Sequence, residues 1–418
     1  MELIVSFDGL SGAKWDATAK GGWSTRQFAR FVRAARDIAA ASPARGSGFG
    51  NPRKVTTLIA KNAGPDLPNS WPGQAIRPRK IEGVMDTIEI GGPDMVASRI
   101  ALGTWAIGGW MWGGADERDA IRTIQAAFDH GITLIDTAPA YGFGRAEEIV
   151  GEALQANGFR DRMLIATKCG LSWRGDKVYR DAAARQIRRE VEESLRRLRT
   201  DHIDLYQVHW PDPLVPIEEI AAVMGELLQQ GKIRAIGVSN FDPAQMNAFR
   251  RIAPLFTTQP PYNLFERAIE ADVLPYAKDT SLVVLAYGAL CRGLLSGRMS
   301  SATVFNGDDL RRTDPKFQPP RFKQYLAAVA ELDRFARARF GKPVLALAVR
   351  WVLDKGPTIA LWGARRPDQL DAVDEVAGWS LDEAAMHEID QILTRTITSP
   401  VGPEFMAPPA ASVERVVA

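Results

Sequence analysis

The chain has 418 residues, of which 46% are hydrophobic and 24% charged, and its formal net charge is +2. This is an ordinary globular composition, and the length allows a sizeable core. Residues 1–84 hold 13 Lys and Arg against 6 Asp and Glu, so the remainder carries a net charge of −5 and gives no indication of a nucleic-acid or membrane partner.

The number of cysteines and the N-terminal residues indicate whether to expect a metal site and where in the cell the protein is located. Cys169 and Cys291 are too few for a disulfide framework, and neither has a neighbour at the spacing of metal ligands. No apolar run reaches the roughly 18 residues that cross a bilayer. The start carries Glu2 and Asp8 and lacks the basic region of a signal peptide. We therefore expect a cytoplasmic protein with no metal site.

Residues 1–84 differ in sequence pattern from the rest of the chain. Residues 29–42 could form a short Arg- and Ala-rich helix, but rich turn signals follow. GSGFG at 46–50 looks like a phosphate loop, yet no strand precedes it and no helix follows, so we assign it no role. We predict a poorly ordered extension, or a translation start placed too early with Met85 as the true start. A targeting or nucleic-acid arm is the less favoured alternative.

From Met85 onwards strand and helix patterns alternate. Residues 87–98 predict a β-hairpin around a Gly-Gly turn. Helical patterns with one apolar stripe separate short β-branched runs. Such alternation is typical of an α/β fold with a parallel sheet, and eight runs favour a closed (β/α)8 TIM barrel with the N-terminal hairpin at its bottom. The runs cover residues 99–105, 132–138, 163–169, 203–210, 233–240, 256–259, 282–288 and 358–363.

Each run stays apolar until its C-terminal end, where usable polar or aromatic groups follow. In barrel enzymes this end carries the active site. We therefore expect a site at the C-terminal mouth of the barrel, built from Thr104, Trp105, Asp136, Lys168, His209, Ser239, Asn240, Gln259, Tyr287, Gly363 and Arg365.

Asp136, Tyr141, Lys168 and His209 end or follow three consecutive strands, so the barrel points them at one mouth. A phenol has a pKa near 10, and a nearby ammonium lowers it. Asp136 would hold Lys168 in place, and a neutral His209 could donate to a carbonyl oxygen. The group suits proton transfer to a carbonyl under reduction by hydride. Taken singly, each residue is better explained as a cap, a solvated lysine or a core histidine.

The sequence from about Met85 to about Ser399 resembles the aldo-keto reductase family. The resemblance rests on LGTWAIGG, LIDTAPAYGFGRAEEIVGEAL, IATKCG, IDLYQVHWPDP, IGVSN, QPPYNLFER, AYGALCRGLLSG and GARRPDQL. Within the family, the last two segments are similar to the bacterial branch that groups with general stress reductases. The resemblance implies Tyr141 as general acid/base, Lys168 and Asp136 as partners that set its pKa, and His209 as the donor that orients the substrate.

The resemblance also implies binding of NADP(H) without a Rossmann fold, and GFGRAE at 142–147 lacks the third glycine of the dinucleotide fingerprint. At the nicotinamide end it implies Thr104, Trp105, Asp136, Ser239, Asn240, Gln259 and the ring of Tyr287. Along the pyrophosphate it implies Gly288, Ala289, Leu290, Cys291, Arg292 and Arg298, with Arg311 as a weaker candidate. At the 2′-phosphate and adenine it implies Gly363, Arg365, Arg366 and Gln369. Paired arginines there favour NADPH over NADH.

The chain departs from the family pattern in two places. Ala372 and Val373 stand where many relatives have Glu-Asn, which leaves the adenine contact and the strength of the NADP preference open. Gly288 and Ala289 replace a common Ser-Pro, a change that backbone contacts could survive.

Tryptophans cluster in Gly-rich loops at the expected mouth rather than at helical or strand spacing. We predict that they form walls of the substrate pocket, against simple loop packing as the alternative: Trp105, Trp110, Trp112, Trp173 and Trp210. Such walls suit aromatic or aliphatic aldehydes and also stack on sugar rings.

Two further segments complete the chain. Residues 293–321 form a long connection, which we predict to be a flap over the cofactor phosphates through Arg298 and Arg311. The barrel domain is expected to span residues 85–405, with 406–418 as a tail.

The favoured function is an NADPH-dependent carbonyl reductase acting on a small molecule, as a monomer or weak homo-oligomer. One alternative is an NADP(H)-binding regulatory subunit with slow turnover, for which the basic 1–84 segment is the one candidate docking surface. Another is a phosphate-binding barrel of unrelated chemistry, in which Ser239, Asn240, Gln259 and Tyr287 would be idle.

Overall fold

The computed structural model describes residues 3–6, 16–19, 85–92 and 94–411. The chain divides into two units, Met1–Gly73 and Gln74–Ala418. In the first unit, β1 (Leu3–Ser6) and β2 (Asp16–Ala19) pair antiparallel. The predicted helix at 29–42 and the loop at 46–50 lie outside the described residues. Within the described part of the chain, no helix has the length and apolar character needed to cross a membrane.

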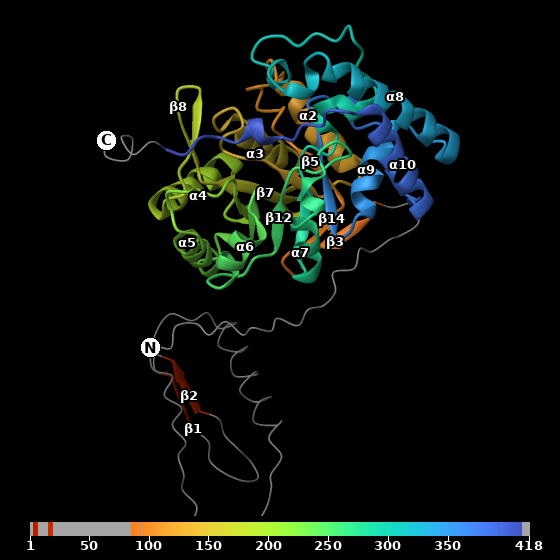
Figure 1. Cartoon of the computed structure of the whole chain (residues 1–418). Helices are drawn as coiled ribbons and strands as arrows, with labels where there is room; N and C mark the ends of the chain where they lie inside the picture. Colours follow the sequence, from red (N-terminus) through yellow and green to blue (C-terminus); the bar gives the residue numbers. More distant parts are fainter. Residues whose placement is uncertain (1–2, 7–15, 20–84, 93, 412–418) are drawn as a thin grey trace, which may run out of the picture. The chain divides into compact units, whose positions relative to one another are not determined.

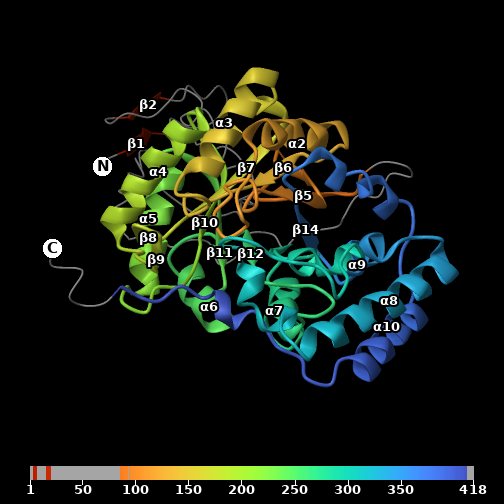
Figure 2. The same ribbon diagram turned by 90° about the horizontal axis from the view of Figure 1, so that it is seen from above.

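The second unit is a closed barrel of eight parallel strands surrounded by helices (Figures 1 and 2). Each strand pairs with the next in the sequence, and the last pairs with the first. The predicted (β/α)8 TIM barrel is therefore confirmed. Its strands are β5 (Ile100–Gly103), β6 (Leu134–Asp136), β7 (Leu164–Cys169), β10 (Ile203–Val208), β11 (Ile233–Ser239), β12 (Thr257–Gln259), β13 (Val283–Ala286) and β14 (Thr358–Gly363).

The predicted hairpin is also present, as β3 (Thr87–Glu89) paired antiparallel with β4 (Val96–Ser98). Its apolar side chains form one cluster with residues of the barrel strands, such as Ile88 and Ile90 with Leu134 and Leu205. The hairpin therefore closes the N-terminal end of the barrel, and each fully buried Ile contributes roughly 1.5–3 kcal/mol to this contact. The opposite end stays open for a site.

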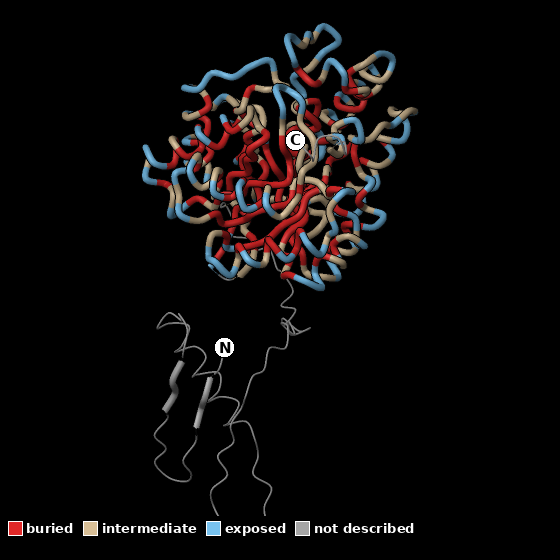
Figure 3. The backbone as a smooth tube through the Cα atoms, turned by 90° about the vertical axis from the view of Figure 1, so that its left-hand side faces the viewer, coloured by how far each residue is buried: buried red, intermediate tan, exposed pale blue. Residues whose placement is uncertain are grey.

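The helices present one apolar stripe to the strands, as their sequence periods predict. In α4, Ile187, Val191 and Leu198 are fully buried, whereas Leu195 is only partly buried. Figure 3 shows buried residues at the centre of the barrel unit and exposed residues at its edge. The outer helices are α2 (Glu117–Asp129), α3 (Arg145–Asn157), α4 (Ala184–Leu198), α5 (Ile217–Gln229), α6 (Pro243–Arg250), α7 (Val273–Asp279), α8 (Arg321–Phe340), α9 (Val344–Asp354) and α10 (Glu383–Thr396).

Two features at the open end were not predicted. A second hairpin, β8 (Leu171–Arg174) and β9 (Lys177–Arg180), follows β7. The C-terminal segment lies along it, because the backbone N–H of Arg180 donates to the Pro409 carbonyl at 2.9 Å and its Nε to the Pro408 carbonyl at 2.9 Å. Residues 408–410, which we assigned to a tail, are thus attached to the barrel unit.

Candidate active site

Four side chains meet at the open end of the barrel. Lys168 in β7 is fully buried, and its Nζ donates to Asp136 Oδ1 at 2.6 Å, to the Thr137 carbonyl at 3.0 Å and to Tyr141 Oη at 3.2 Å. The rings of Tyr141 and His209 lie edge to face, with centroids 5.8 Å apart. A buried ammonium needs such acceptors to remain charged. The fold therefore brings together the four residues that the strand ends suggested.

The second oxygen of Asp136 is also occupied. It accepts from Gln259 Nε2 at 2.8 Å and from Gln207 Nε2 at 3.2 Å. Sequence reasoning missed Gln207, although it lies two residues before His209 and alternation along a strand gives such residues related directions. Gln259, which the resemblance places at the nicotinamide, therefore supports the carboxylate with its amide nitrogen.

The proton states of Tyr141 and His209 follow from burial. Burial and the Asp136 carboxylate raise the pKa of Tyr141 well above its usual value. The sequence argument expected Lys168 to lower this pKa, but the ammonium is already paired with Asp136. Burial and the charge of Lys168 lower the pKa of His209 well below its usual value. At neutral pH the site therefore holds a protonated phenol and a neutral imidazole, both able to donate a proton or hydrogen bond.

Two cavities meet at Tyr141. The first, the arginine cleft, has a volume of about 190 Å³ and includes Arg292, Arg311 and Arg365 in its lining. The second, the aromatic cavity, has a volume of about 300 Å³. The residues that line both are Trp105, Tyr141, Tyr287 and Met406. The phenol therefore stands where a ligand of one cavity would touch a ligand of the other.

Most of the residues expected to hold a cofactor surround these cavities. Those lining the arginine cleft are Thr104, Trp105, Asp136, Tyr287, Gly288, Leu290, Arg292, Arg311, Gly363, Arg365 and Gln369. Ser239, Asn240 and Gln259 line the aromatic cavity beside His209. Tyr287 Oη donates to Asn240 Oδ1 at 3.0 Å, which fixes both side chains at the junction.

Four of the expected cofactor residues line neither cavity. Ala289 and Cys291 are fully buried, because their turn packs into the core. Arg366 donates to Asp368 at 3.0 Å, and Arg298 lies 3.6 Å from the same carboxylate. Asp368 thus holds both guanidinium groups at the surface, and a cofactor contact of these four residues stays a prediction.

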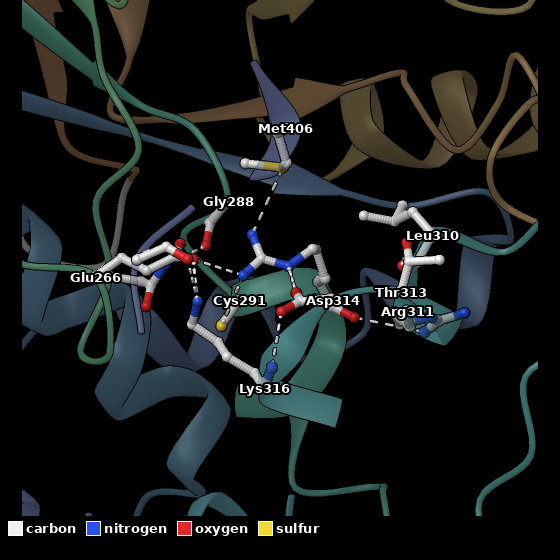
Figure 4. Close-up of polar contacts among 12 residues, drawn as sticks. Glu266, Gly288, Cys291, Leu310, Arg311, Thr313, Asp314, Lys316 and Met406 are labelled. Carbon is white, nitrogen blue, oxygen red and sulfur yellow. Dashed lines mark hydrogen bonds and ion pairs between the residues drawn. The ribbon is translucent and has the colours of Figure 1, made fainter. Parts of the chain in front are cut away.

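Arg292 reaches the cleft but is already paired (Figure 4). Its Nε donates to Asp314 Oδ2 at 2.6 Å and its Nη2 to Glu266 Oε1 at 2.5 Å, and Lys316 Nζ lies 2.8 Å from the same Glu266 oxygen. All four side chains are buried. Arg292 therefore anchors the turn after β13 to the predicted flap, of which residues 314–317 form a buried base rather than a free loop.

The tryptophans divide between three places. Trp105, Trp110 and Trp210 line the aromatic cavity as predicted. Trp112 instead lines the arginine cleft, and Trp173 lines a separate hollow beyond β8 and β9. Trp173 packs against Phe143 with centroids 5.8 Å apart, whereas Leu171, two residues earlier in β8, lines the aromatic cavity.

Several lining residues had no signal in the sequence. The C-terminal segment brings Phe405, Met406 and Pro408 to the aromatic cavity, and β9 brings Val178. The first three residues lie outside the α-helices and β-strands. No sequence period predicts the path of such a segment. Among the described residues, no group of three His, Cys, Asp or Glu could hold a metal ion.

The arginine cleft has donors suited to an extended anionic ligand. The indole N–H groups of Trp105 and Trp112 are buried and have no hydrogen-bond partner among the described residues. Arg311 and Arg365 add two guanidinium groups beside Trp112. Unpaired buried donors and arginines are the groups that phosphates and ribose oxygens bind. These residues fit a nicotinamide dinucleotide.

Comparison with known proteins identifies the family. The aldo/keto reductase family model matches residues 99–394. Aldo-keto reductase YhdN of Bacillus subtilis (strain 168) is 61% identical over 326 residues, which cover 78% of this chain and 98% of that protein. The NADH-specific methylglyoxal reductase of Escherichia coli (strain K12) is 36% identical over 332 residues, covering 74% of this chain and 100% of that protein.

Solved structures agree with this result. The glycerol dehydrogenase AKR11B4 from Gluconobacter oxydans is 58% identical with a TM-score of 0.70, covering 77% of this chain and 99% of that chain. An aldo-keto reductase from Klebsiella pneumoniae in complex with NADPH is 28% identical with a TM-score of 0.59, covering 79% and 100%. The barrel, the site and these relatives together show that the chain belongs to the aldo-keto reductase family, whose members reduce carbonyl groups with nicotinamide cofactors.

Proposed function

We propose that this protein reduces aldehydes and ketones to alcohols with NADPH, and that Tyr141 is the proton donor. The observation that carries the proposal is the position of Tyr141, which lines both cavities and lies 3.2 Å from the buried Nζ of Lys168. A proton donor for a developing alkoxide must stand where the substrate meets the hydride source.

The chain's own residues account for the proton side of the reaction. A bound nicotinamide would supply the hydride to the carbonyl carbon. Neutral His209 donates a hydrogen bond to the carbonyl oxygen and orients it toward Tyr141. Tyr141 transfers its proton as negative charge forms on that oxygen. Lys168, held by Asp136, stabilises the phenolate that remains, and Gln207 and Gln259 keep the carboxylate in place.

NADPH is proposed as the preferred cofactor because of the arginines. Arg311 and Arg365 line the cleft beside Trp112, and these two guanidinium groups would hold a 2′-phosphate. Asn240 and Tyr287 would hold the nicotinamide end. The Klebsiella relative binds NADPH, whereas the Escherichia coli relative is named as NADH-specific, so the preference rests on this chain's own cleft.

The aromatic cavity supports a small carbonyl substrate. Its volume is about 300 Å³, and its walls include Trp105, Trp110 and Trp210. His209 and Asn240 supply polar groups beside Tyr141. This volume lies at the lower end of the range for small-molecule sites. It fits short aldehydes, dicarbonyls or a single aromatic ring.

Turnover by the full chain tests the proposal. NADPH oxidation is measured with short aldehydes, aromatic aldehydes, dicarbonyls and aldoses, for the natural chain and for Tyr141→Phe. The variant should bind NADPH normally and lose about 10²–10⁴-fold in kcat, the usual contribution of general acid catalysis. Tyr276→Phe, which removes a phenol bonded to Asn247 far from the cavities, should leave kcat unchanged. Tight NADPH binding without turnover would instead favour the regulatory alternative.

A further inference from the structure

The loop of residues 105–114, here called the aromatic loop, takes part in both cavities. Trp105, Ala106 and Trp112 line the arginine cleft, and Trp105, Trp110 and Met111 line the aromatic cavity. One segment thus forms a wall of the proposed cofactor site and a wall of the proposed substrate site. Whatever fixes this loop affects both.

Two arginines of the cleft hold Trp112. Arg365 Nη1 donates to the Trp112 carbonyl at 2.7 Å and to the Gly114 carbonyl at 2.8 Å. The guanidinium carbon of Arg311 lies 5.2 Å from the centroid of the Trp112 ring, and Asp309 holds this guanidinium through Nε at 2.9 Å and Nη2 at 2.5 Å. The backbone and the ring of Trp112 are therefore both held by these two arginines of the cleft lining.

From Trp112 a row of rings leads to the proton donor. The rings of Trp112 and Trp105 meet edge to face with centroids 5.6 Å apart, and Trp105 stacks on Tyr141 with centroids 5.9 Å apart and an interplanar angle of 22°. Because closely packed side chains transmit strain to one another, a displacement of one ring acts on the ring beside it. The position of Trp112 therefore constrains Trp105, which lies against Tyr141 and forms part of the aromatic cavity.

Arg365 has donors left for a phosphate. A guanidinium carries five N–H groups, and its two Nη1 hydrogens match the two carbonyls of the aromatic loop. The side-chain Nε and Nη2 make no hydrogen bond with the described residues, and the residue lines the cleft. A phosphate on this free edge would fix the guanidinium, and with it the loop on the other edge.

We propose that Arg365 couples the 2′-phosphate of the cofactor to the substrate cavity through Trp112 and Trp105. This inference rests on the proposed function. Arg365 is here a positioning residue for the carbonyl substrate, in addition to binding phosphate. NADPH, which can fix Arg365, should give a lower KM for the carbonyl substrate than NADH, which lacks the phosphate. Coupling of this kind is typically about five- to 150-fold.

The first test needs no turnover. Hydrogen exchange of the full chain without cofactor is compared for the natural protein, Arg365→Ala and Arg337→Ala. Arg365→Ala should speed exchange across residues 105–114. Asp308 still accepts from the N–H groups of Met111 and Gly113 at 2.8 and 2.9 Å, so the loop keeps its place in the fold. Arg337 in α8 is exposed and bonds Asp333 four residues earlier, so its removal should leave that exchange unchanged.

The second test separates the two roles of Arg365 by using NADH. At saturating NADH no 2′-phosphate is present, so only the loop contact of Arg365 can matter. Arg365→Ala should then raise the KM for the carbonyl substrate at least about fivefold, with a smaller change in kcat. Arg365→Lys, which can make one such contact, should recover part of the loss.

The outcomes are distinct. Faster exchange together with a raised KM under NADH supports the coupling. Unchanged exchange, or an unchanged KM with NADH while NADPH affinity alone falls, overturns it and leaves Arg365 as a phosphate ligand only. If the natural protein turned nothing over, the proposed function would fall, and the exchange result would still decide whether Arg365 holds the loop.

Discussion

Tyr141 keeps its proton because the cation beside it is already neutralised. Lys168 makes its shortest bond, 2.6 Å, with Asp136, and reaches the phenol only at 3.2 Å. Burial and the carboxylate therefore dominate and raise the pKa of Tyr141. The phenol is protonated before a substrate arrives, and Lys168 becomes important when charge develops on the phenol oxygen.

A pH profile tests this arrangement. Because the pKa of Tyr141 is raised and the pKa of His209 is lowered, neither group titrates near neutrality. We expect kcat/KM for carbonyl reduction to stay level between about pH 7 and the usual phenol pKa of about 10. Initial rates at subsaturating substrate give this profile, with cofactor binding measured at each pH. A loss of activity centred near pH 7–8 would mean that the phenol ionises there.

The same two groups affect stability in opposite pH ranges. His209 is kept neutral in the fold, so unfolding gains a proton at low pH and stability falls below the usual histidine pKa of about 6.5. Tyr141 keeps its proton in the fold, so its contribution is present below about pH 10 and is lost as pH rises further. Tyr141→Phe should therefore flatten the alkaline side of a plot of unfolding free energy against pH. An unchanged alkaline slope would contradict this expectation.

At the scale of elements, Glu190 joins α4 to the end of β7. Its carboxylate accepts from the backbone N–H of Gly170 at 2.8 Å, while Oε1 has no partner among the described residues. Burial raises the pKa of Glu190 to about 8. An unfolded glutamate ionises at about pH 4.3, so between these two values the folded state is disfavoured progressively as pH rises.

Glu190→Gln removes this pH dependence and keeps an oxygen for Gly170. We expect the variant to gain about 2–4 kcal/mol of unfolding free energy at pH 8 and little at pH 5. Denaturant unfolding at the two pH values provides the measurement. Glu192→Gln, on the exposed side of the same helix, serves as the control. An equal effect at both pH values would indicate packing rather than ionisation as the cause.

The flap of residues 293–321 combines a buried base with an exposed tip. Asp314 and Lys316 are buried around Arg292, whereas Val304 is 74% exposed. Arg311 lies between these parts and lines the arginine cleft. We expect NADP+ to slow proteolysis within residues 298–315, because a phosphate on Arg311 would order the tip. Equal cleavage with and without cofactor would show that the tip does not respond.

Regular elements were predictable because burial imposes a period on them. Asp136, Lys168 and His209 could be located because apolar strands stop there and barrel strands share a direction. Loop directions follow no such period. Trp112 and Trp173 were expected at the substrate pocket, whereas Trp112 lines the arginine cleft and Trp173 lines a separate hollow. Gln207 lies inside a strand whose residues are all buried. The sequence pattern there does not distinguish a polar residue of the site from a position in the core.

At the scale of the whole molecule, the barrel unit contains its own core. Among the described residues, both apolar clusters begin at Ile88 or later. We expect a chain of residues 85–418 to fold and to keep the kcat/KM and melting temperature of the full chain. Parallel thermal unfolding and NADPH oxidation of the two chains decide this. A clear loss in the shorter chain would assign residues 1–84 a part in folding or catalysis.

The aromatic cavity is closed by residues from the very end of the chain. Phe405, Met406 and Pro408 line it, and Arg180 holds the segment through the Pro408 and Pro409 carbonyls. These residues follow β14, the last barrel strand, in the sequence, so all eight strands can pair before this segment joins the barrel. A chain cut after residue 404 would therefore keep the complete barrel and lose walls of both cavities, because Met406 lines the arginine cleft as well.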